Sequence, residues 1–438
     1  MSRGSDPADN KIAMRNISIL LLSALVVLSG CSSVTLDTKT SFALADAAIV
    51  PTDSEYSSAS RLIALMPDSP RGHNALAVYY IKRNRETGDF SFNTKASDAV
   101  DKALSLDPSD ISARKLRAAL HLGFHRFDDA LNEAGQLRKE FPNDPFVLGV
   151  LSDANVEMGK YTEALEATQA MVDSRPDSSS YARVAQLRSL HGDSAGAIKM
   201  MTLAAKTADP ADKTLQSWCL VQLGDEHWKA GKYVEAEKIY DEALAINPGY
   251  FLALVSKGRV RASTGDFEAA EKYLNKAQSF VPNANATHLL ADIHSLSGQS
   301  ERANAEYAKF DKIQTDLGDG ADHKKLILSK ANRGMTEEAV EMALAEYAAE
   351  KNIHSAELVA WALYKAGRAS EATPYIQEAM RLNTIDARVA FHGGMIARAN
   401  GNNREAKRLL DKALSQNPGF DVLEAEEARR SLVELSKK

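Results

Sequence analysis

Apolar and small residues recur at helical spacing along most of the chain, in short segments separated by glycine or proline. In the segment from Leu220 to Pro248, such residues return every three or four positions on both sides of Gly231. Glycine readily adopts the left-handed backbone that ends a helix, so a first helix is expected to end at Gly231. A second helix is expected to begin at Tyr233 and to end at Pro248, because proline cannot continue helical hydrogen bonding.

This two-helix pattern returns at a period of about 34 residues. Eight glycines are each followed five residues later by an alanine. The pairs are Gly159/Ala164, Gly192/Ala197, Gly231/Ala236, Gly265/Ala270, Gly298/Ala303, Gly334/Ala339, Gly367/Ala372 and Gly401/Ala406. A fixed period of this length indicates a stack of similar units, each burying its apolar face on its neighbours.

The repeating unit resembles the tetratricopeptide repeat, a helix–turn–helix of 34 residues. The matching residues of one unit are Leu223, Gly224, Gly231, Ala236, Tyr240, Ala243 and Pro248. The resemblance covers residues 61–419 and implies an all-α fold, a right-handed superhelical solenoid of about ten such repeats. Residues 420–438 are expected to form a C-terminal capping helix, and residues 83–93 a longer loop inside the first unit.

Composition agrees with a helical solenoid and narrows the range of partners. Aromatic residues make up only 7% of the 438 residues, and no alternating strand pattern is present. The net charge is −6, so the chain lacks the broad basic face that nucleic-acid binding requires. We expect no nucleic-acid partner.

The N-terminal residues have the pattern of a targeting signal. Residues 17–28 form a mostly apolar run that is too short to span a membrane but has the length of a signal-peptide core. The run leads into Leu28-Ser29-Gly30-Cys31, which resembles the bacterial lipobox and implies that Cys31 is lipidated. We therefore expect a signal peptide over residues 1–30, with Met14 as an alternative start, and a flexible tether over residues 31–60.

The residues after Cys31 bear on localisation. Ser32 and Ser33 follow the cysteine, without aspartate at the next position. By resemblance to enteric sorting rules, this favours an outer-membrane lipoprotein facing the periplasm, with inner-membrane anchoring left open. If Cys31 is not modified, the alternative is a soluble periplasmic binding module.

Several side chains are candidates for contact with a partner. Repeats of this family line a concave groove with side chains from the first helix of each unit, and the resemblance implies that a protein or peptide binds there. The residues at matching positions are Trp218, Asp225, Trp228, Glu357, Trp361, Tyr364, Phe391, Met395 and Arg398. Aromatic anchors beside charged groups suit such a role, although packing between repeats is the alternative interpretation of each.

Other reactive residues are better explained by structure than by chemistry. His121 and His125 have a zinc-compatible spacing, but position 122 is leucine where a metalloprotease has glutamate. In repeat register they occupy a packing position and the turn position. Cys219 is expected to be a buried small residue. We expect no metal, no cofactor and no catalytic residue.

These observations predict a non-enzymatic, lipid-anchored scaffold for protein–protein interactions in bacterial envelope assembly or secretion. Pilus, outer-membrane protein and polysaccharide export machineries are the systems in which similar lipoproteins act. An accessory domain of an enzyme is a further alternative, and it would require a titratable cluster such as His227 with Asp225 in the groove.

Overall fold

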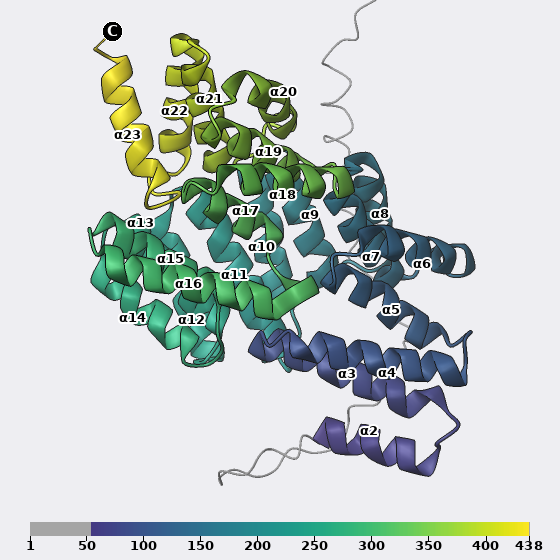
Figure 1. Cartoon of the computed structure of the whole chain (residues 1–438). Helices are drawn as coiled ribbons and strands as arrows, with labels where there is room; N and C mark the ends of the chain where they lie inside the picture. The colour runs from purple at the N-terminus through teal and green to yellow at the C-terminus, as the bar shows by residue number, and fades with distance from the viewer. Residues whose placement is uncertain (1–53, 438) are drawn as a thin grey trace, which may run out of the picture. The chain divides into compact units, whose positions relative to one another are not determined.

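The computed structural model describes residues 54–437, with the backbone alone for Asp319, and their regular structure is entirely helical (Figure 1). The helices are α2 (Ser54–Leu65), α3 (Pro70–Thr87), α4 (Ser91–Leu106), α5 (Ile111–Gly123), α6 (Phe127–Glu140), α7 (Pro145–Glu157), α8 (Tyr161–Ser174), α9 (Ser178–Leu190), α10 (Ser194–Thr207), α11 (Lys213–Lys229), α12 (Tyr233–Ile246), α13 (Phe251–Ser263), α14 (Phe267–Gln278), α15 (Ala284–Leu296), α16 (Ser300–Leu317), η2 (a 3-10 turn, Gly318–Gly320), α17 (His323–Asn332), α18 (Thr336–Ala349), α19 (Ile353–Lys365), α20 (Ala369–Ala379), α21 (Ala387–Ala399), α22 (Asn403–Gln416) and α23 (Glu424–Leu435).

The helices form ten pairs, from α3/α4 to α21/α22, with α2 before the first pair and α23 after the last. Each helix packs mainly against its neighbours along the chain, which is the contact pattern of a solenoid. This confirms the predicted all-α repeat fold. Within residues 54–437, no helix is both long and apolar enough to cross a membrane.

The glycine–alanine pattern has the structural role that the sequence predicts. All eight glycines have positive φ angles, between 68° and 86°, and end the first helix of their pair. The alanine five residues later lies in the second helix and is at most 3% exposed. A larger side chain there would push the paired helices apart. In the α5/α6 pair, His125 takes the place of the turn glycine with a φ of 56°, and Ala130 is fully buried.

The predicted loop over residues 83–93 is wrong. Helix α3 continues to Thr87, and α4 begins at Ser91. Gly88 ends α3 with a φ of 74° and donates its N–H to the carbonyl of Asn84. It is a turn glycine like the others, but Asn93 stands five residues later instead of alanine, so the sequence pattern did not reveal it.

A second set of contacts joins pairs that are far apart in the sequence. The turns at Gly159, Gly192 and Gly231 pack against three later segments, which follow α18, α20 and α22. A Cβ on Gly159 would lie 2.1 Å from the carbonyl oxygen of Lys351, and one on Gly192 would lie 2.5 Å from that of Asn383. The turn glycines from Gly265 onward face open space. We call these three junctions the turn–loop contacts.

Two tyrosines secure the outer junctions, each standing two residues after its turn glycine. The Tyr161 hydroxyl accepts a hydrogen bond from the N–H of Ile353 at 3.0 Å. The Tyr233 hydroxyl donates to Asn417 Oδ1 at 2.5 Å and accepts from the N–H of Gly419 at 2.7 Å. These bonds satisfy backbone groups in the later loops, so the solenoid is closed by specific polar contacts.

Replacing Gly159 with alanine tests the turn–loop contacts. Any L-residue at this positive φ costs about 1 kcal/mol, and at Gly159 the added Cβ also collides with the Lys351 carbonyl. Gly265→Ala is the matched control, because Gly265 has a φ of 79° and no atom within 4 Å of its Cβ position. In urea unfolding followed by circular dichroism, Gly159→Ala should lose at least about 2 kcal/mol more than Gly265→Ala. Equal losses would contradict the contact.

Candidate functional site

Two adjacent cavities lie among the described helices. The large cavity, of about 1080 Å³, is lined by the first helices of six successive pairs, α3, α5, α7, α9, α11 and α13. The small cavity, of about 600 Å³, lies among α15, α16, α17, α19, α21 and α23. Lys324 and His354 line both. The cavities therefore meet where α17 and α19 face the earlier repeats.

Charged side chains on the wall of the large cavity are mostly paired with one another. Closest approaches are 2.6 Å for Arg183–Asp153, 2.7 Å for Lys229–Glu226 and 2.8 Å for Lys324–Glu157. Paired charges produce little net field. The remaining wall offers aromatic surface from Trp218 and amides from Gln186 and Gln222. Such a wall suits hydrogen bonding and apolar contact better than recognition by charge.

Two of the nine predicted groove residues line a cavity, Trp218 the large one and Glu357 the small one. Trp361 and Phe391 are fully buried and Met395 is 3% exposed, all within the core of the last repeats. The indole N–H of Trp361 donates to Asn332 Oδ1 at 2.8 Å. In this structure these three side chains are used for packing between repeats, which is the alternative that the sequence left open.

The other predicted residues bridge neighbouring pairs. Asp225 accepts hydrogen bonds from the Tyr240 hydroxyl at 2.6 Å and from Arg259 at 2.5 Å. Arg259 also lies over the ring of Trp228, 4.1 Å from its centroid. Asp225 is therefore occupied by contacts with Tyr240 and Arg259.

At the C-terminal end, Tyr364 stacks on Trp361, with ring centroids 4.9 Å apart. Arg398 donates to Ser431 at 2.8 Å and pairs with Glu434, which ties α21 to α23. Contact of a partner with any of the nine predicted residues stays a prediction.

A buried charge network joins α19, α21 and α23. Glu357, fully buried, lies 3.0 Å from Arg388 Nε and 3.0 Å from Nδ1 of His392. His392, also fully buried, lies 3.3 Å from Glu424 on its other side. Its ring stacks on Trp361, with centroids 3.8 Å apart. The network fixes the relative positions of three helices by directional contacts.

The pKa values of this network shift as expected for ion pairs. Burial opposes the charge on His392, but Glu424 and Glu357 outweigh it and raise the pKa of His392 above its ordinary value. Burial also opposes the charge on Glu357, yet Arg388 and His392 hold the pKa of that carboxyl well below its usual range. Glu357 is therefore charged at neutral pH, and removing its partners would leave an uncompensated buried charge.

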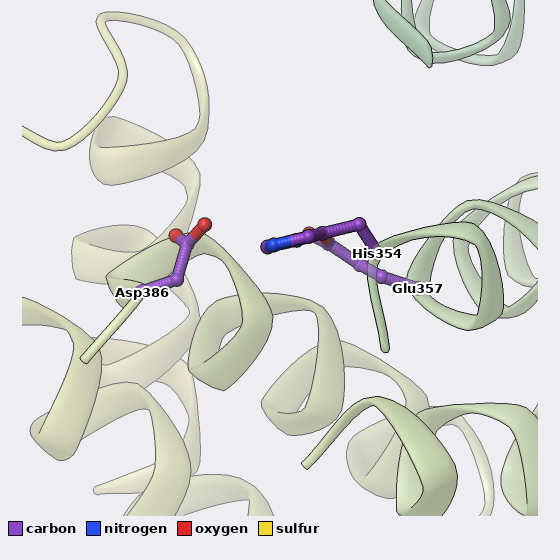
Figure 2. Close-up of side chains that lie close together, drawn as sticks. All are labelled: His354, Glu357 and Asp386. Carbon is purple, nitrogen blue, oxygen red and sulfur yellow. The ribbon is translucent and has the colours of Figure 1, made fainter. Parts of the chain in front are cut away.

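A second cluster shares Glu357 with this network. Figure 2 shows the His354 ring pointing toward the carboxylate of Asp386, with Glu357 beside it. One ligand atom from each of the three side chains can be chosen so that all lie within 4.8 Å of one another. His354 and Glu357 come from the start of α19, and Asp386 caps the N-terminus of α21. No spacing in the sequence indicates this cluster, because its members belong to two helix pairs.

The sequence analysis also singled out two cysteines and two histidines. Cys219 is free and fully buried, and burial raises its pKa to about 12, as expected for an unreactive thiol. His121 and His125 do not belong to any metal-ligand cluster within the described residues. Cys31 and the predicted signal peptide lie outside the described residues.

Paired helices with left-handed turns define a helical-repeat protein of the solenoid class, and comparison with known families specifies the repeat. Residues 115–179 and 227–293 match two family models described as tetratricopeptide repeat. These two segments therefore match the tetratricopeptide repeat, in agreement with the resemblance seen in the sequence. Among curated proteins, none matches this chain.

Solved structures that are similar to this chain include a tetratricopeptide repeat protein and MamA. A tetratricopeptide repeat protein from Parabacteroides merdae ATCC 43184 is 18% identical, with a TM-score of 0.35, over 64% of this chain and 99% of its own. MamA is 21% identical, with a TM-score of 0.30, over 37% of this chain and 92% of its own.

Asp421 in the small cavity provides a test of the electrostatics there. Burial, together with Glu424 and Asp292, raises its pKa from 3.8 to about 6. A folded-state pKa above the unfolded value gives a stability contribution that is present below about pH 4 and lost as the pH rises through about 6. Asp421→Asn removes the charge and keeps an oxygen for the N–H groups of Leu423 and Glu424.

We therefore expect Asp421→Asn to be more stable than the wild type at pH 8 by about 1–2 kcal/mol, a figure reduced for the partial exposure of the side chain. The two proteins should be equally stable near pH 4. Urea unfolding at both pH values measures the difference. A variant that is less stable at pH 8 would show that the charge of Asp421 is compensated.

Proposed function

We propose that this protein is a non-enzymatic, lipid-anchored scaffold of the bacterial envelope, which holds a segment of a partner protein in its large cavity. The lipobox-like sequence ending at Cys31 would anchor it in the outer membrane, facing the periplasm. The observation that carries the proposal is the wall of the large cavity, built by the first helices of six successive repeats. Envelope assembly and secretion are the processes to which such an anchored scaffold contributes.

The chemistry of the wall supports a protein segment as the occupant. Trp218 offers an apolar surface, and Gln186 and Gln222 offer amides that can pair with an extended peptide backbone. Because the nearby charges are already paired, binding is expected to depend weakly on salt. The turn–loop contacts favour a preformed cavity, which lowers the ordering cost of binding.

Crosslinking in living cells tests the scaffold proposal. A photo-crosslinking amino acid at Gln222 lies on the cavity wall, and the same amino acid at Val234, which is 81% exposed, is the matched control. Light should join position 222, and not position 234, to one envelope protein. Loss of the product on addition of a peptide from that partner would locate the contact in the cavity. Equal products from both positions, or none, would contradict the proposal.

The lipid anchor is tested separately. Cells grown with a clickable fatty acid should label the wild type and should not label Cys31→Ser. If the wild type is not labelled but is found in the periplasm, the protein is a soluble binding module and not an anchored scaffold. The crosslinking result distinguishes that outcome from failure of the cavity assignment, because the cavity does not depend on Cys31.

A further inference from the structure

The cluster where the two cavities meet has the donor set of a metal site. His354 lines both cavities, Asp386 lines the large one and Glu357 the small one. One imidazole nitrogen and two carboxylate oxygens are ligands that suit Zn²⁺ and similar divalent transition-metal ions. We propose that His354, Glu357 and Asp386 bind one such ion at this junction.

The three ligand atoms would have to move only slightly closer together to bind an ion. Ligand atoms about 2.1 Å from a tetrahedral ion lie about 3.4 Å apart, and here they lie within 4.8 Å of one another. His354 and Asp386 are partly exposed at the cavity walls, so their side chains can rotate inward. The backbone at His354 is held by the capping box that Asn352 and Ser355 form at the start of α19, and Asp386 itself caps the N-terminus of α21.

The ligands differ in how firmly they are already held. The His354 side chain has no hydrogen bond or ion pair within the described chain, so an ion would supply its first polar partner. Asp386 accepts the N–H of Arg388 through one oxygen at 2.9 Å. Glu357 is oriented by Arg388 and His392, each at 3.0 Å. In known metal sites, hydrogen bonds from neighbouring groups to the ligands orient them in the same way.

Charges around the cluster act in both directions. The N-termini of α19 and α21 and the guanidinium of Arg388 disfavour a cation. Carboxylates nevertheless outnumber cations: Glu357, Asp386 and Glu424 surround Arg388 and His392, and Lys324 lies between Glu157 and Glu350. A divalent ion therefore enters surroundings with excess negative charge, and we expect binding weaker than that of a closed structural zinc site.

The site would keep open coordination positions, since the chain supplies only three ligands. These positions face the cavities, where a water or a carboxylate or imidazole group of a bound molecule could complete the coordination. Metal binding itself requires no partner, so its test is independent of the scaffold proposal.

Titration of the full-length protein with Zn²⁺ alone tests the site. After removal of metal with a chelator, calorimetry should show one ion per chain. His354→Ala should weaken binding at least about ten-fold. His288→Ala is the matched control, because His288 lines the small cavity outside the cluster, and it should bind like the wild type.

A second variant and a spectroscopic measurement separate loss of the ligands from loss of the fold. Asp386→Asn retains an oxygen that caps α21, so it should fold normally, as circular dichroism would show, and still lose affinity. X-ray absorption of the zinc-loaded protein should show one imidazole nitrogen and carboxylate oxygens at about 2.0–2.2 Å. Absence of binding, or equal binding by the wild type and His354→Ala, would overturn the proposal.

Discussion

The turn–loop contacts are the constraint on which the rest of this structure depends. In a simple repeat array, each unit touches only its neighbours, so contacts remain local. Here the turn at Gly159 meets Lys351, and Tyr233 bonds to Asn417, across nearly two hundred residues. These contacts bring α17 and α19 opposite the early repeats, and Lys324 and His354 consequently line both cavities. Without them, α17 and α19 would not be held against the early repeats, and the two cavities would not meet.

Small side chains make this closure possible. Within a pair, Gly224 allows the ring of Tyr240 to approach so closely that a Cβ would lie 2.3 Å from it. Between distant units, Gly159 and Gly192 leave room for backbone carbonyls at their turns. The same residue type therefore serves two levels of packing. Its left-handed backbone ends a helix, and at some turns its missing side chain admits another part of the chain.

The sequence predicts the first level of packing and misses the second. Period, turn glycines and buried alanines follow from contacts within one repeat, so they are visible in the pattern. The turn at Gly88 was not predicted, because Asn93 stands where the pattern has alanine. Cavities and charge clusters depend on the curvature accumulated over several repeats, which a 34-residue period does not encode. Register alone also cannot distinguish Trp218, on a cavity wall, from the fully buried Trp361. Tyr161 and Tyr233, each two residues after a turn glycine, were the sequence signals that could have indicated the contacts between distant repeats.

A double-mutant cycle between Tyr233 and Asn417 tests the closure most directly. The two side chains are hydrogen-bonded at 2.5 Å, although they belong to repeats that are not neighbours in sequence. Unfolding free energies of the wild type, Tyr233→Phe, Asn417→Ala and the double variant give their interaction energy. A closed solenoid predicts a favourable coupling of about 0.5–1.5 kcal/mol. Strict additivity, with no coupling, would contradict the closure and the junction of the two cavities that depends on it.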